Sequence, residues 1–155
     1  MPRFTKRDRY VELLESARQA AGNASCPYSG YSVGAAVLTS DGQVFTGCNV
    51  ENATYTLTIH AEVAAATAAI SAGALKAALL RGQNQFQFIS AVACVCLKAY
   101  ETWHCALCRQ FLCEFGVDMD IVVPRADGTA LWKPLKQLLK HPFVPASLSS
   151  CSHTH

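Results

Sequence analysis

The sequence has little excess charge of either sign and no long hydrophobic run. Lys and Arg number 13 and Asp and Glu number 11 in 155 residues, a formal net charge of +2, which falls well short of the basic surface of a nucleic-acid-binding domain. No apolar stretch reaches the roughly 18 residues that a membrane span requires, and residues 3–10 are too polar for the core of a secretory signal. We therefore expect no nucleic-acid partner, no membrane partner and a cytoplasmic location.

Charged residues are also scarce, at 15%, whereas hydrophobic residues make up 51%. This composition argues against disorder, and it suggests that some apolar surface meets another subunit. Because domains have roughly 100 to 200 residues, we expect a single domain over residues 1–155, with flexible ends at 1–5 and 147–155. A chain of this length can build a hydrophobic core without disulfides or metal.

Eight cysteines are present, but without a secretory signal reduced thiols are the expectation. Cys94 and Cys96 alternate with valine and leucine in a strand-like run, so we expect them to be small buried hydrophobic residues. Only Cys105 and Cys108 have the spacing of metal ligands.

Hydrophobic periodicity and turn residues predict an α/β protein. Strands that are joined through helices are mostly parallel, whereas Asp41-Gly42 marks a hairpin, so the expected sheet is mixed and has helices on its faces. The predicted helices are 6–21, 61–72, 105–115 and 134–139, and the predicted strands are 33–38, 43–50, 86–97, 118–123 and a short edge strand at 129–132.

Four residues at the starts of two helices carry the predicted chemistry. His60 and Glu62 open one helix, Cys105 and Cys108 open the next, and each helix follows a strand, so the two starts can converge. One imidazole and two thiolates supply three zinc ligands and leave a fourth position for water, as in catalytic zinc sites. Glu62 can then accept a proton from that water and pass it to a substrate nitrogen. The pattern predicts hydrolytic deamination of a nucleobase, and it matches the His-x-Glu and Cys-x-x-Cys signature of zinc deaminases except for one proline.

Beyond this signature, the sequence resembles the cytidine deaminase family of free-nucleoside zinc enzymes, specifically its short homotetrameric class, over about residues 10–148. Residues 26–36, 46–53 and 108–110 are similar to segments of that family. The resemblance implies a three-layer α/β/α fold with a mixed five-stranded sheet. It also implies one zinc ion per subunit and conversion of cytidine and deoxycytidine to uridine and deoxyuridine plus ammonia, a reaction of pyrimidine salvage.

The resemblance also implies which residues bind the substrate. Asn49 and Glu51 would hydrogen-bond the ribose 3′-hydroxyl, Tyr31 would lie against the base, and the backbone around Ala61 would hold the pyrimidine carbonyl. Residues 138–145 look like the family segment that inserts an aromatic side chain into a neighbouring active site. Phe143 is therefore the candidate residue from a neighbouring subunit of a homotetramer, and the alternative is that it packs within its own subunit.

The chain departs from the family pattern at two places. His60 and Val63 stand where short members usually have cysteine and arginine, a consistent pair of changes, because a neutral imidazole leaves less negative charge for an arginine to offset. Trp103 and His104 replace Ser or Thr followed by Pro, which alters the pocket near the leaving amine. Trp103 is a candidate substrate contact, and His104 is either a helix-start residue without a role or a polar contact in that pocket.

Two other functions remain open at this point. The altered pocket favours a deaminase of a modified cytosine nucleoside or of a blasticidin-type nucleoside antibiotic. A polynucleotide-editing or non-catalytic zinc-binding module is a third hypothesis, which the near-neutral charge disfavours.

Overall fold

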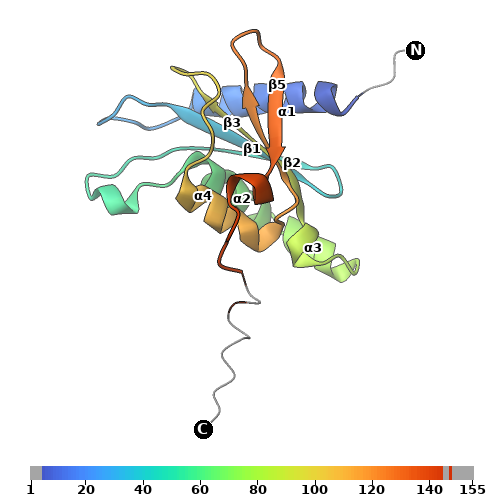
Figure 1. Ribbon diagram of the computed structural model, residues 1–155. Helices are drawn as coiled ribbons and strands as arrows, with labels where there is room; N and C mark the ends of the chain where they lie inside the picture. Colours follow the sequence, from blue (N-terminus) through green and yellow to red (C-terminus); the bar gives the residue numbers. More distant parts are fainter. Residues whose placement is uncertain (1–4, 145–146, 148–155) are drawn as a thin grey trace.

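A five-stranded sheet forms the centre of the computed structural model, which describes residues 5–144 and Ser147 (Figure 1). The strand order is β2-β1-β3-β4-β5. The β3–β4 pair is parallel and the other three pairs are antiparallel, so the sheet is mixed, as predicted. The strands are β1 (Val33–Thr39), β2 (Val44–Cys48), β3 (Ile89–Cys96), β4 (Asp120–Pro124) and β5 (Ala130–Pro134).

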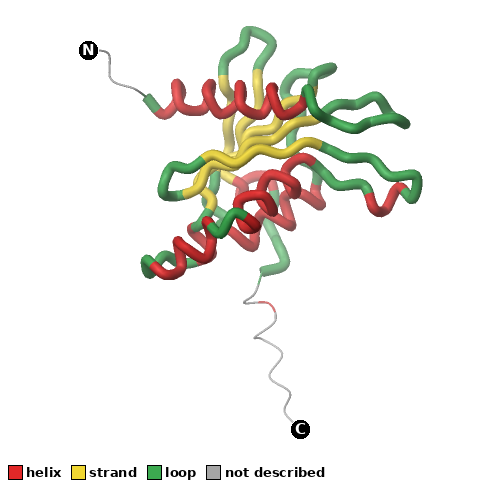
Figure 2. Tube along the Cα trace, turned by 180° about the vertical axis from the view of Figure 1, so that it is seen from behind, coloured by secondary structure: helices red, strands yellow, loops and turns green. Residues whose placement is uncertain are grey.

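Helices cover both faces of this sheet. Figure 1 and Figure 2 show α1 on one face and α2, α3 and α4 on the opposite face, which confirms the three-layer α/β/α arrangement. The expected flexible ends, 1–5 and 147–155, lie outside the described residues except for Thr5 and Ser147. The helices are α1 (Lys6–Ala21), α2 (Ala61–Ser71), α3 (Ala74–Leu80), α4 (Ala106–Leu112) and α5 (Leu135–Leu138).

Helix α1 begins at a capping box and packs closely on β1. The Thr5 side chain accepts a hydrogen bond from the backbone N–H of Asp8, and the Asp8 carboxylate accepts one from the N–H of Thr5, which satisfies two free donors of the helix start. A Cβ atom on Gly34 would lie 2.0 Å from the carbonyl oxygen of Ala17. The helix therefore rests directly on the strand backbone, and its buried residues are Tyr10, Leu13, Leu14, Ala17, Ala20 and Ala21.

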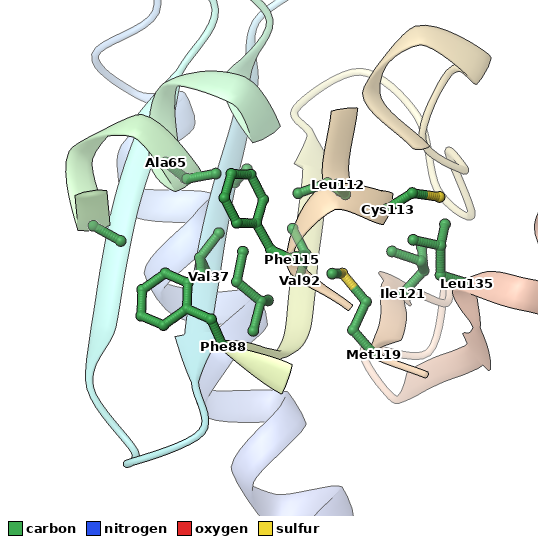
Figure 3. Close-up of a cluster of buried hydrophobic side chains, with 14 of the residues drawn as sticks. Val37, Ala65, Phe88, Val92, Leu112, Cys113, Phe115, Met119, Ile121 and Leu135 are labelled. Atoms are coloured by element: carbon green, nitrogen blue, oxygen red, sulfur yellow. The ribbon is translucent and has the colours of Figure 1, made fainter. Parts of the chain in front are cut away.

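Helix α2 makes the corresponding contact on the other face. A Cβ atom on Gly47 in β2 would lie 2.4 Å from the backbone nitrogen of Ala65, so only glycine allows this approach. The small side chains of α2 join a core of larger apolar residues from β1, β3, β4 and the segment after α4 (Figure 3). The buried residues of α2 are Ala61, Glu62, Ala65, Ala66 and Ala69.

The structure corrects several predicted boundaries. No helix was predicted over α3, but Gly73 adopts a left-handed conformation with φ of +82° and the Ala-Leu-rich segment after it is helical, as its helix propensity favours. The strand expected from residue 86 begins at Ile89 because residues 85–87 form a single 3₁₀ turn. The predicted helix 105–115 is α4 followed by a tighter 3₁₀ turn, and α5 is shorter than predicted because Pro134 pairs within the sheet.

Within the described residues, no single helix is long and apolar enough to cross a membrane. Helices α2 and α3 pass that test only as a pair, and they are bent by 54° relative to each other.

Candidate metal centre and active site

The sheet brings the ends of two strands to one edge. Gly34, at the start of β1, pairs with Cys48 at the end of β2 and with Val95 near the end of β3. The segments that follow β2 and β3 lead to α2 and α4, so both helices begin at this edge. The predicted convergence of the two helix starts is confirmed.

Three candidate metal ligands meet there. His60 precedes α2 and Cys105 precedes α4, both with extended backbone, and Cys108 is buried in the first turn of α4. The His60 Nδ1 atom lies 3.4 Å from the Cys105 Sγ atom and 3.2 Å from the Cys108 Sγ atom. All three ligand atoms lie within 4.8 Å of one another.

This donor set fits a tetrahedral zinc ion. With Zn–N near 2.0 Å and Zn–S near 2.3 Å, tetrahedral geometry places nitrogen and sulfur about 3.5 Å apart, close to both distances found here. Burial, followed by the charge of Glu62, raises the pKa of Cys108 well above its ordinary value. A thiolate at this position is therefore unfavourable without a cation, which is the condition that zinc binding satisfies.

Glu62 lies beside these ligands in the first turn of α2. Only 5% of its surface is exposed, yet it lines the same cavity as His60 and Cys105. A carboxylate at this place is sheltered from bulk water and close to the candidate metal position, so it is suited to exchange protons with a molecule bound in the cavity.

Glu62 also belongs to a second cluster, which consists of three buried side chains. Its carboxylate, the Cys94 thiol and the His104 ring form a cluster of three buried groups whose ligand atoms lie within 4.8 Å of one another. The His104 Nδ1 atom is 3.8 Å from the Glu62 Oε1 atom, and neither ring nitrogen of His104 has a hydrogen-bond partner in the described structure. Burial lowers the pKa of His104 and raises that of Cys94, which favours the uncharged form of both side chains.

A cavity of about 420 Å³ opens above Glu62, within the range of small-molecule sites. The predicted base-binding residues Tyr31 and Ala61 line it, and so does Trp103. The first backbone N–H groups of α2, including that of Ala61, have no partner within the helix and can donate to a ligand. His104 does not line the cavity; its side chain is fully buried.

The two predicted ribose-binding residues also line this cavity and are held firmly. Glu51 accepts hydrogen bonds from the backbone of Tyr28, at 2.9 Å, and from both the backbone and the hydroxyl of Ser29. The Ser29 hydroxyl is the largest cause that lowers the pKa of Glu51, so Glu51 is a carboxylate.

The side-chain amide of Asn49 forms hydrogen bonds within the protein. Its side-chain oxygen accepts from the backbone N–H of Val33 at 2.9 Å, and its nitrogen donates to the carbonyl oxygen of Tyr31 at 2.9 Å. One of its two N–H groups therefore remains for a ligand.

Phe143 lies outside the cavity of its own chain. Its side chain is 60% exposed, while its backbone forms two hydrogen bonds with the Gln110 amide, at 2.6 and 3.1 Å. Whether its ring packs in its own subunit or in a neighbouring one stays a prediction.

Sequence reasoning missed three features of the site. Ser29 fixes Glu51, Thr102 lines the cavity, and Cys94 lines it as well as being buried. The strand alternation predicted correctly that Cys94 and Cys96 are buried, but alternation does not reveal that Cys94 faces Glu62. Ser29 lies 22 residues before Glu51, and no local pattern connects them.

Comparisons with known proteins agree with this geometry. Residues 7–123 match the family model described as "Cytidine and deoxycytidylate deaminase zinc-binding region". A probable cytidine deaminase of Dictyostelium discoideum is 37% identical over 139 residues, which cover 88% of this chain and 85% of that protein. A cytidine deaminase of Mycobacterium tuberculosis is 43% identical over 104 residues, or 67% of this chain and 69% of that protein.

Solved structures give the same result. The crystal structure of cytidine deaminase from Burkholderia pseudomallei superposes with a TM-score of 0.68 and 35% identity, covering 85% of this chain and 97% of that one. That from M. tuberculosis has a TM-score of 0.66 and 36% identity, covering 85% and 94%. With the family model spanning most of the chain and relatives matching along most of their length, this protein belongs to the cytidine and deoxycytidylate deaminase family.

Proposed function

We propose that this protein catalyses the hydrolytic deamination of cytidine and deoxycytidine to uridine and deoxyuridine, with release of ammonia, and that it holds one zinc ion per subunit. The observation that carries the proposal is the meeting of three ligand atoms, from His60, Cys105 and Cys108, next to a buried carboxylate in a cavity of nucleoside size. Family membership supports the same activity. We further propose a cytoplasmic role in pyrimidine salvage.

His60, Cys105 and Cys108 would hold the zinc ion, which would supply Lewis-acid activation of water at neutral pH. Glu62 moves the protons. It accepts a proton from the attacking water and delivers it to N3 of the ring as oxygen adds to C4; it then accepts the remaining proton from the new C4 hydroxyl and delivers it to the exocyclic nitrogen. The bond from C4 to that nitrogen then breaks, and ammonia leaves. The burial of Glu62 keeps competing water away from these transfers.

Asn49 and Glu51 recognise the sugar. The remaining N–H of Asn49 donates to the 3′-oxygen. The Glu51 carboxylate accepts a hydrogen bond from the 3′-hydroxyl, because Tyr28 and Ser29 fill three of its roughly four acceptor positions and leave one for the sugar. A site built in this way strongly rejects analogues that lack the hydroxyl, since its own polar groups are then left unpaired. A nucleoside is therefore preferred over the free base.

The base lies between Tyr31 and the start of α2. The backbone N–H at Ala61 donates to the pyrimidine carbonyl, and Trp103 bounds the cavity on the amine side. The Trp103 ring is itself held by the ammonium group of Lys133, 5.5 Å from the ring centroid, a cation–π contact that restricts its movement.

Phe143 completes the active site of a neighbouring subunit in a homotetramer. Its exposed ring and its backbone anchored to Gln110 support this role. Phe143→Ala is expected to raise KM for cytidine and leave the metal content of its own subunit unchanged. A sedimentation measurement that finds only monomers with full activity would exclude this arrangement.

The main test uses purified, zinc-loaded protein with cytidine. Loss of the cytosine absorbance band and release of ammonia are expected, and Glu62→Gln should lose roughly 10²- to 10⁴-fold in kcat while keeping its fold and its zinc. Full activity of Glu62→Gln would refute the proposed proton transfers.

A modified cytosine nucleoside is the second candidate substrate, because Trp103 lines the cavity where the family has a small residue. Rates on cytidine, on C4- and C5-modified cytidines and on blasticidin S distinguish the two. A modified nucleoside turned over faster than cytidine would favour this second candidate.

A further inference from the structure

The His104 side chain is buried, and its two ring nitrogens form no hydrogen bonds within the described structure. Its side chain has no exposed surface, and neither ring nitrogen has a hydrogen-bond partner among the residues that the structure describes. A neutral imidazole has one N–H donor and one acceptor. Leaving buried polar atoms unpaired costs free energy comparable with a lost hydrogen bond, so an unpaired ring at this place calls for a partner in the working enzyme.

Among the described groups that cluster with this ring, only Glu62 offers a strong acceptor for its N–H. The Glu62 Oε1 atom is 3.8 Å from Nδ1, and Glu62 is itself buried. Cys94, the third member of the cluster, offers a thiol, which is a weak acceptor. Arg109 directs its guanidinium to the carbonyl oxygens of His104 and Leu138, both at 2.6 Å, and a guanidinium accepts no hydrogen bond.

The separation of the two groups is itself informative. A distance of 3.8 Å exceeds a hydrogen bond but falls short of the roughly 4.5 Å that a bridging water spans. A movement of about 1 Å by either side chain makes a direct bond, and catalytic hydrogen bonds commonly tighten in this way once substrate is bound.

We propose that His104 is a positioning residue that donates its Nδ1–H to the Oε1 atom of Glu62 and so directs the Oε2 atom toward the substrate. The proposal rests on the proposed deaminase function of Glu62. His104 does not line the cavity and does not touch the substrate; it acts through the carboxylate. The role is particular to this chain, since the family pattern that the sequence resembles has proline at this position.

A matched pair of variants tests the role. Leu and Asn have the same branched skeleton, but only Asn retains an N–H donor near the place of Nδ1. His104→Leu is expected to lower kcat for cytidine roughly 10- to 100-fold, as misplacing a catalytic group does, with KM changed less than about threefold. His104→Asn is expected to recover kcat to within about fivefold of the wild type, with equal zinc content in all three proteins.

A second measurement does not depend on turnover. In protein labelled with ¹⁵N-histidine, long-range ¹H–¹⁵N spectra are expected to show that His104 carries its proton on Nδ1, and Glu62→Ala is expected to shift that resonance. A proton on Nε2, or a resonance that Glu62→Ala leaves in place, would overturn the proposal even if His104→Leu fails to fold.

The outcomes separate this inference from the proposed function. Wild-type protein that turns over cytidine, with equal kcat losses in His104→Leu and His104→Asn or a change confined to KM, would overturn the positioning role alone. Wild-type protein without cytidine turnover would refute the proposed function, and the spectra would still report whether the His104–Glu62 pair exists.

Discussion

At the scale of single residues, the hydrogen-bond donors around Glu51 keep its side chain ionised. Glu51 stays ionised because the Ser29 hydroxyl and the backbone of Tyr28 donate to it. Ser29→Ala should therefore raise the pKa of Glu51 toward its ordinary value. A protonated Glu51 accepts a hydrogen bond from the sugar hydroxyl less well than a carboxylate does. Near pH 5 more of the variant than of the wild type is protonated at Glu51, so the ratio of the variant's KM for cytidine to the wild-type KM should be larger near pH 5 than at pH 7.5. Steady-state kinetics at both pH values check this, and an equal KM ratio at the two would contradict it.

The residues with metal chemistry could be predicted from the sequence, because ligand type and spacing are local signals. His60, Cys105 and Cys108 meet as expected. The contacts that complete the site could not be predicted, since they join distant positions: Ser29 with Glu51, and His104 with Glu62. Such pairs depend on how the segment before β1 and the segments after β2 and β3 come together, which no periodicity in the sequence encodes.

At the scale of elements, two glycines set how closely helices approach the sheet. Gly34 faces α1 and Gly47 faces α2, and a Cβ atom at either would lie within 2.4 Å of helix backbone atoms. Gly47→Ala and Gly34→Ala are each expected to lower the free energy of unfolding by about 1–3 kcal/mol through overpacking. Only Gly47→Ala is expected to displace the helix that carries Glu62 and begins directly after His60.

Kinetics and metal content distinguish the two glycine variants, and Gly34→Ala is the matched control. Gly47→Ala should bind zinc more weakly and lose kcat, whereas Gly34→Ala should keep both near the wild-type values in spite of a similar loss measured by urea unfolding. Identical effects on activity would show that α2 adjusts without moving the site.

Elements with a strong apolar pattern, such as α1 and β1, are predicted nearly to their ends. The sequence does not predict helix α3, because a glycine after a helical segment marks its end; the left-handed Gly73 follows α2, and a new helix begins directly after it. A glycine in the sequence does not show on which side helical structure resumes.

At the scale of the whole molecule, α1 and β4 are joined by a buried hydrogen bond. The Tyr10 hydroxyl donates to the Asp120 carboxylate at 2.6 Å, across 110 residues of sequence. Tyr10→Phe should lower the free energy of unfolding at pH 7 by about 1–2 kcal/mol. Denaturant unfolding measures this loss, with cytidine turnover as the control, because the pair lies on the sheet face opposite α2 and the active site.

The same pair predicts a pH dependence. Burial, with the Asp120 hydrogen bond, raises the pKa of Tyr10 in the folded protein, whereas an unfolded tyrosine ionises near pH 10. Above that pH the unfolded chain releases a proton that the folded chain retains, so this contribution to wild-type stability falls as the pH rises. Tyr10→Phe lacks the ionisation, and the stability gap between the two proteins should narrow from pH 7 to pH 11. A gap that stays constant would contradict this assignment.

The hydrophobic cores on both sheet faces contain none of the three candidate metal ligands. Only Ala61, in the core beneath α2, is a direct sequence neighbour of one of them, His60. Removing zinc with a chelator is therefore expected to abolish activity while far-ultraviolet circular dichroism is largely retained, and added zinc should restore turnover. The thermal midpoint should fall, because a ligand that binds the folded state stabilises it. Loss of most secondary structure on chelation would show instead that folding requires the metal.

The two hydrogen bonds between Gln110 and Phe143 connect the end of the described chain to α4, two residues after Cys108. Any loosening of α4 when the metal leaves therefore also releases the segment around residue 143. In limited proteolysis, the metal-free enzyme should first be cut near residues 139–144, well before the sheet is attacked, and the cut should slow when zinc returns. The susceptibility of residues 139–144 to proteolysis would thus depend on whether the metal is bound.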